Sequence, residues 1–139
     1  MLRFIVVLLA GLALIAPGAH VYEIVNKMAL SKADYFVVQK IYIGWWMAGL
    51  LLPLSLLANI LLGYLEKNLL ALGAAALILS NLVIFYFFTY PVNVATENWA
   101  AMSENWETLR RQWEFSHAVN AGVTFASFCL SIAAVLNCT

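Results

Sequence analysis

The sequence predicts an all-α fold: a four-helix transmembrane bundle made of two antiparallel hairpins, with a long polar helical segment between the third and fourth spans. Three observations support this prediction. Of the 139 residues, 65% are hydrophobic and 10% are charged, whereas soluble domains have about 45–50% apolar and about 25% charged residues. The mean hydropathy is +0.90. Four stretches lack any charged residue and are long enough to cross a bilayer. A chain of this composition must present much of its surface to lipid.

We expect a single membrane domain over residues 1–139, with spans at about residues 4–22, 41–63, 69–88 and 118–136. A spanning helix needs about 20 apolar residues. Lipid offers the backbone no hydrogen-bonding partner, so each span must be helical. The first stretch, with Arg3 before it and Ala16-Pro17-Gly18 near its end, also resembles a secretory signal peptide. We favour a true first span over that alternative.

The second span has a clear helix start. Ser31 precedes Asp34 by three residues, which matches a capping box, so the helix should begin near Ser31 and run on into the membrane. Pro53 should kink it at mid-depth. Residues 64–68 are too few for more than a tight turn, so the second and third spans should be antiparallel neighbours.

Pro91 should end the third helix, and residues 91–117 form the longest polar segment. Both long connections, 20–40 and 91–117, then lie on one side of the membrane. They carry five of the seven basic residues, so the positive-inside rule predicts that this side is cytoplasmic. Seven basic and seven acidic residues cancel, which argues against nucleic-acid binding.

Small and polar residues within the spans predict how the helices pack. Ala118, Gly122 and Ala126 form a small-residue ridge, as do Gly44 and Ala48, and such ridges allow close helix contact within a homo-oligomer or a larger membrane complex. Some polar residues lie within the spans and should face the bundle interior. These are Ser55, Asn59, Ser80, Asn81 and Asn120.

A seven-residue period links Trp99, Trp106, Trp113 and Asn120. On a helix, Trp106, Arg110, Trp113 and His117 would share one face. One interpretation is an aromatic anchor at the membrane interface. The other is an aromatic-walled pocket that contains a cation and an imidazole.

The two histidines are at the same membrane level, and each has a glutamate three residues away: His20 with Glu23, and His117 with Glu114. Such pairs on facing helices hold metals in four-helix bundles. The set would suit a transition metal such as iron or copper, and also manganese or zinc. Haem ligation by the two histidines is a less favoured alternative. A third interpretation is purely structural, with Glu23 paired to Lys27 one turn away.

Several segments resemble the anthrone-oxygenase-like family of small four-span membrane proteins. They are Ala19–Glu23, Gln39–Trp45, Tyr90–Asn93 and Trp106–Ala121. The resemblance covers nearly the whole chain and implies a bacterial inner-membrane protein. Most bacterial members have no assigned function, whereas fungal members oxygenate an anthrone to an anthraquinone.

By position, the family pattern falls on Asn93, Trp106, Arg110 or Arg111, Trp113 and His117, and Asn120 stands where members usually have a basic residue. From this pattern and the chemistry of the side chains we predict a substrate site formed by Trp106, Trp113, Asn93 and Asn120. In this hypothesis His117 acts as general base and the Arg110 guanidinium stabilises the enolate.

Two function classes remain. One is an oxidoreductase or oxygenase that acts on a lipophilic aromatic or quinone-like molecule near one membrane face. The other is a non-catalytic accessory subunit or assembly factor of a larger membrane complex.

Overall fold

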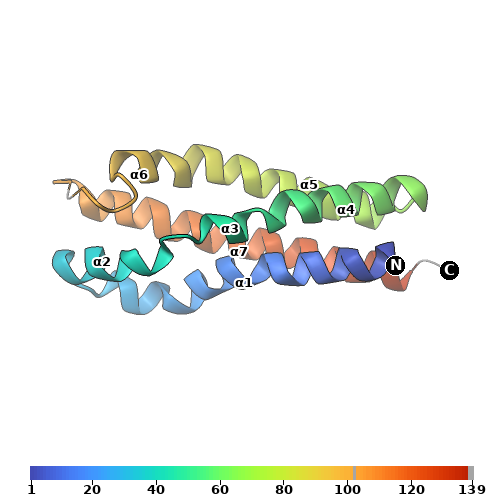
Figure 1. The fold of residues 1–139 in the computed structure, drawn as a ribbon, viewed down its shortest axis with the longest axis horizontal. Helices are drawn as coiled ribbons and strands as arrows, with labels where there is room; N and C mark the ends of the chain where they lie inside the picture. The colour runs from blue at the N-terminus through green and yellow to red at the C-terminus, as the bar shows by residue number, and fades with distance from the viewer. Residues whose placement is uncertain (102, 138–139) are drawn as a thin grey trace.

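The computed structural model describes residues 1–101 and 103–137 and confirms the predicted fold class (Figure 1). Within those residues, four helical segments are long and apolar enough to cross a membrane: Leu2–Met28, Trp46–Leu65, Leu69–Ala95 and Trp106–Leu136. This is the architecture of an integral multi-pass membrane protein. The elements in chain order are α1 (Leu2–Met28), α2 (Lys32–Val38), the 3-10 turn η1 (Gln39–Tyr42), α3 (Trp46–Gly49), α4 (Leu51–Leu65), α5 (Leu69–Ile84), the π-helical η2 (Phe85–Thr89), α6 (Tyr90–Ala95) and α7 (Trp106–Leu136).

The long helices form a closed ring, in which α1 packs against α4 and α7, and α5 packs against the other sides of α4 and α7. The chain termini and the α4–α5 turn lie at one end of the bundle, and α2 and α6 lie at the other (Figure 1). The turn at residues 64–68 is tight, as predicted. Asn68 caps α5 with its side chain and also donates a 2.9 Å hydrogen bond to the Ala134 carbonyl of α7.

The second span is not the continuous helix that we predicted from Ser31. The Ser31 hydroxyl does accept from the Asp34 amide, so the capping prediction is confirmed. However, η1 ends at Tyr42, and Gly44 has φ +91°, a backbone conformation that helices do not contain. The helix resumes at Trp46 and is interrupted again at Leu50, three residues before Pro53. The second ridge that we expected is therefore not formed, because Gly44 lies outside any helix.

We predicted that Pro91 would end the third helix, but the helix continues past it. The π-helical turn η2 ends at Thr89, two residues before Pro91, and the Tyr90 amide donates to the Phe85 carbonyl five residues back. This wider turn helps the helix to pass the residue that lacks an N–H, and α6 continues to Ala95. The polar helix expected between the last two spans is the N-terminal part of α7, whereas residues 96–105 form turns and bends apart from the undescribed residue 102.

Two packed clusters fill different parts of the bundle. One, near the chain termini, consists of Val6, Ala58, Leu62, Ala71 and Ala134. The other, beside α2 and α6, is aromatic and consists of Tyr35, Phe36, Val92, Trp99 and Trp113. The cavity described below borders the aromatic cluster, because Trp99 and Trp113 belong to both.

Candidate functional site

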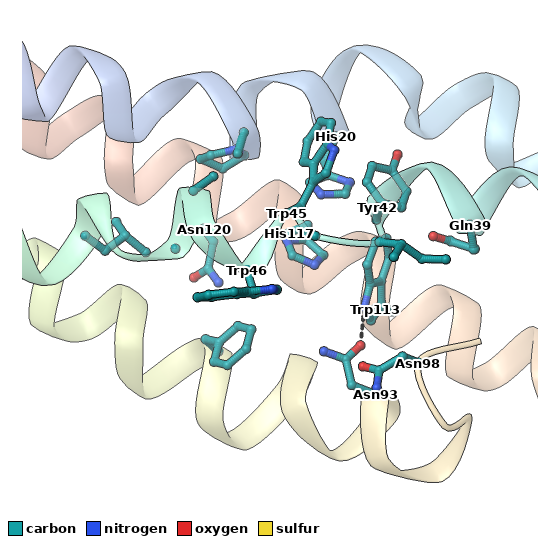
Figure 2. A pocket seen from close by; sticks show the side chains of 18 of the residues that line it. His20, Gln39, Tyr42, Trp45, Trp46, Asn93, Asn98, Trp113, His117 and Asn120 are labelled. Atoms are coloured by element: carbon teal, nitrogen blue, oxygen red, sulfur yellow. Dashed lines mark hydrogen bonds between the residues drawn. The ribbon is translucent and has the colours of Figure 1, made fainter. Parts of the chain in front are cut away.

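A cavity of about 710 Å³ lies within the bundle at the level of the interrupted second span (Figure 2). Ligand pockets commonly enclose about 300–1,000 Å³. All four helical segments line the cavity. From α1 come Ala13, Ala16, Pro17 and His20, and from α7 come Trp113, His117 and Asn120. The region of the second span provides Gln39, Tyr42, Ile43, Gly44, Trp45, Trp46, Ala48, Gly49 and Leu52, and the region from α5 to the turn after α6 provides Asn81, Phe85, Asn93, Asn98 and Trp99. Non-helical backbone at membrane depth is tolerated where it lines such a cavity.

The two histidines meet in the wall of this cavity. Their imidazole rings are stacked, with centroids 4.1 Å apart and an interplanar angle of 20°. Tyr42 covers His20 at 4.5 Å between centroids, and Trp113 packs against His117 at 4.2 Å (Figure 2). The sequence prediction that both histidines share one membrane level is therefore confirmed.

Trp113 is held in place by Asn93. The indole Nε1 donates a 2.8 Å hydrogen bond to Asn93 Oδ1, drawn as a dashed line in Figure 2. Asn93 also accepts from the Asn98 amide through its own carbonyl, at 2.8 Å. The structure therefore brings Asn93, Trp113, His117 and Asn120 of the predicted site to one cavity.

Four buried polar atoms in the cavity wall have no hydrogen-bonding partner among the residues that the structure describes. They are His20 Nδ1, Gln39 Oε1, Trp99 Nε1 and Asn120 Oδ1. Their residues are at most 6% exposed. Because an unpaired buried polar group costs about 1–3 kcal/mol, such groups generally have a water or ligand partner. These buried atoms, an indole donor, two amide acceptors and an imidazole nitrogen, all belong to residues that line the cavity.

The turn that carries Trp99 is strained. Glu97, Asn98 and Trp99 all have left-handed φ values, between 50° and 66°. Each such residue costs about 1–2 kcal/mol relative to the right-handed conformation. Thr96 stabilises the turn, because its hydroxyl accepts from the Trp99 amide at 3.1 Å and donates to the Val92 carbonyl at 2.8 Å. The turn places Trp99 6.0 Å from Trp113, between ring centroids, and the strain is concentrated at the cavity.

A buried charge network lies next to the cavity. Lys27 Nζ is 2.7 Å from Glu114 Oε1, and both side chains are almost completely buried. Tyr35 donates to the same oxygen at 2.8 Å, and Gln39 donates to it at 3.4 Å. Burial and the negative charge of Glu114 raise the pKa of Tyr35, which therefore stays a neutral donor. Ionisable groups inside a membrane bundle are costly, so they commonly have a functional role.

The network continues from Lys27 toward the protein surface. Lys27 Nζ donates to the Tyr42 hydroxyl at 2.9 Å, and that hydroxyl donates to Glu23 Oε2. Burial, together with the hydrogen bond and the charge of Glu23, raises the pKa of Tyr42. Glu23 also lies 3.9 Å from Lys27, so the expected i,i+4 pairing of these two side chains is confirmed.

Arg110 and Trp106 do not line the cavity. Arg110 Nη1 donates to the Leu30 carbonyl at 3.0 Å and to the Lys27 carbonyl at 3.4 Å, so it caps the C-terminal end of α1. Its guanidinium also lies 4.4 Å from the Trp106 ring centroid. The guanidinium is thus committed to the helix end, and this geometry does not provide the enolate-stabilising role that we assigned to it.

The predicted metal set is not assembled. His20 and His117 lie together, but Glu114 is bonded to Lys27 and Tyr35, and Glu23 is bonded to Tyr42. Among the residues that the structure describes, no three His, Cys, Asp or Glu side chains converge as metal ligands do. The haem alternative does not fit either, because axial imidazoles approach iron from opposite faces of the macrocycle, whereas these rings stack face to face at 4.1 Å.

Sequence reasoning assigned no role in the site to Tyr42, Gln39, Trp45 or Lys27. Tyr42 and Gln39 lie within the Gln39–Trp45 segment that supports the family resemblance, which was the one available indication. Comparison of the chain with protein-family models, with curated proteins and with solved structures finds no significant match.

Proposed function

We propose that the protein binds a flat, lipophilic aromatic or quinone-like molecule in the cavity and acts on it as an oxygenase-type oxidoreductase. The observation that carries this proposal is the stacked His20–His117 pair in the wall of a tryptophan-lined cavity of about 710 Å³. Tryptophan side chains suit the faces of a flat ring system. The unpaired polar atoms of the wall suit its oxygen substituents.

The proposed reaction begins with proton transfer. His117 removes a proton from an acidic C–H bond of the bound molecule. The resulting negative charge on the neighbouring oxygen is stabilised by the unpaired Trp99 Nε1–H, in the role that we first gave to Arg110. Molecular oxygen then oxidises the carbanion, so that an anthrone and O₂ yield an anthraquinone and water. The resemblance to the anthrone-oxygenase-like family, including its implied bacterial inner-membrane location, supports this choice.

The mouth of the cavity favours ligand entry from the membrane. Its exposed lining includes the apolar side chains of Ile43, Trp46 and Phe85, beside the polar Asn98. A lipophilic molecule with a polar edge would partition to this interfacial level. The ends of α1 and α2 and the 96–105 turn form this side of the protein, and the positive-inside rule favours it as cytoplasmic.

The test is binding and turnover in lipid nanodiscs. Anthrone, 1,8-dihydroxyanthrone and 2-methyl-1,4-naphthoquinone are titrated while tryptophan fluorescence is recorded, and ¹⁸O₂ incorporation into the product is measured. We expect His117→Ala to bind the same probes but to lose about 10²–10⁴-fold in turnover. The control is Tyr64→Phe, a 79% exposed residue in the last turn of α4. Absence of binding by the wild-type protein, or full turnover by His117→Ala, would refute the proposal.

A second candidate is a non-catalytic subunit or assembly factor, and one observation favours it. The predicted ridge of Ala118, Gly122 and Ala126 does form on α7, but Gly122 and Ala126 face outward, and nothing lies within 4 Å of where a Gly122 Cβ would be. Such a surface suits another helix of a homo-oligomer or a larger complex. If Gly122→Leu dissociates a native complex, measured by mass spectrometry from nanodiscs, this candidate gains support over the enzyme.

A further inference from the structure

The cavity has a neighbour on its outer side. A smaller recess of about 360 Å³ is lined by Tyr22, Glu23, Asn26, Lys27, Leu30, Val38 and Ile41. We call it the outer recess. Tyr42 lines the inner cavity but not the outer recess, whereas Glu23 and Lys27 line the outer recess but not the inner cavity. The hydrogen bonds of the Tyr42 hydroxyl therefore cross the wall between the two spaces.

We propose that Tyr42, Glu23 and Lys27 form a proton path between the inner cavity and the outer recess. The proposal rests on the proposed function, because a base in the cavity that removes a proton from the substrate must afterwards release that proton to water. The Tyr42 hydroxyl accepts from Lys27 Nζ at 2.9 Å and donates to Glu23 Oε2. The ring of the same tyrosine lies 4.5 Å from that of His20, which in turn stacks on His117.

Each transfer along this path conserves charge and atoms. A proton taken up by the imidazole pair reaches the Tyr42 oxygen through water of the cavity, which both His20 and Tyr42 line, while the Tyr42 O–H proton moves to Glu23 Oε2. Tyr42 ends as a neutral phenol, and Glu23 ends as a carboxylic acid. Glu23 then releases its proton to water in the outer recess, where its side chain is 36% exposed. The net result is that one proton leaves the cavity.

The neighbouring charges have positioning roles in this path. The Lys27 ammonium stabilises the negative charge that develops on the Tyr42 oxygen during transfer. It also makes a cation–π contact with the Tyr42 ring, 4.6 Å from the ring centroid. Glu114 fixes Lys27 from the α7 side at 2.7 Å. The remaining groups face Glu114 rather than Tyr42, namely Tyr35 of α2, which donates to its carboxylate, and Arg110 of α7, which lies over the Tyr35 ring. This arrangement gives the buried Lys27–Glu114 pair a function.

The chain has only two histidines, which makes the path directly measurable. ¹⁵N-histidine labelling of the ligand-free protein in nanodiscs reports on the ring nitrogens of His20 and His117 alone. The exchange rate of the imidazole N–H protons with water is measured by NMR. We expect exchange to be slowed by about 10²-fold in Tyr42→Phe and in Glu23→Gln. Tyr64→Phe, in the last turn of α4 and in the lining of neither space, should exchange like the wild type.

Unchanged exchange in either variant would overturn the proposal, since water would then reach the rings through the mouth of the cavity. If Tyr42→Phe fails to fold, Glu23→Gln decides the matter, because it alters a partly exposed side chain. The measurement uses no aromatic ligand. Slowed exchange together with a failure to bind the aromatic probes would therefore support the proton path and refute the proposed function.

Discussion

Replacement of Lys27 by methionine should destabilise the protein strongly. The change removes the ammonium that lies 2.7 Å from Glu114 Oε1 and leaves a carboxylate whose side chain is 0% exposed. Tyr35 and Gln39 still donate to that oxygen, but Glu114 Oε2 has no partner in the described part of the chain. Removing one member of a buried ion pair costs about 3–5 kcal/mol. We expect a loss of that size in the free energy of unfolding.

The double variant Lys27→Met/Glu114→Gln separates the charge effect from the packing effect. With both charges gone, the introduced amide is neutral and its oxygen can still accept from Tyr35, so the double variant should recover most of the loss. The comparison pair is Arg3–Glu66, at 3.0 Å with side chains 44% and 28% exposed. Glu66→Gln at this exposed pair should cost about 1 kcal/mol or less.

The assay is reversible unfolding in mixed detergent micelles, followed by circular dichroism and by tryptophan fluorescence. Coincident transitions with the two probes would justify a two-state free energy. A loss below about 1 kcal/mol in Lys27→Met would refute the reasoning, because it would place the pair in a solvated environment. A double variant that is less stable than Lys27→Met would also refute it, because neutralising the unpaired carboxylate would then bring no recovery.

Three further predictions concern the cavity and its wall. Trp113→Phe removes the hydrogen bond to Asn93, so it should cost about 1 kcal/mol in thermal unfolding and weaken binding of the aromatic probes in the fluorescence titration. Gly44→Ala should cost about 1–2 kcal/mol although its Cβ would meet nothing within 4 Å, because its φ is +91°; the melting temperature measures this. Tyr35 and Tyr42 should remain protonated in the folded protein at pH values above about 10, where a free tyrosine ionises, and absorbance at 295 nm reports this. Because their folded pKa values are raised above the unfolded value of about 10, the stability present below that pH should decline as the pH rises beyond it.

Local sequence rules predicted what local interactions determine. The Ser31 cap and the 64–68 turn formed as expected, because each depends on a few neighbouring residues. Asn59 and Asn81 face the interior as predicted, since each finds a partner on α7: the Ser131 hydroxyl donates to Asn59, and Asn81 donates to Thr124. Ser80 was predicted to face inward but is exposed, because it satisfies its hydroxyl locally by donating to the Ala76 carbonyl.

Features that depend on tertiary partners were not predictable in this way. The Glu-x-x-His spacing suggested metal ligands. Spacing alone does not reveal that Lys27, on another helix, forms a salt bridge with Glu114. Arg110 shares a helix face with His117, yet the open carbonyls at the end of α1 determine where its guanidinium lies. The left-handed turn at residues 97–99 contains no glycine that would have indicated it.

The irregular backbone and the candidate site have a common physical origin. A span that leaves helical geometry at Gly44 cannot expose free backbone groups to lipid, so the bundle must enclose that region or provide a cavity there. In this protein the break in the second span, the π-helical turn of the third and the strained turn at residues 97–99 all contribute to one cavity wall. The interruptions, unpaired polar atoms and strained residues are therefore concentrated around the cavity that His20 and His117 line, which is where the proposed ligand would bind.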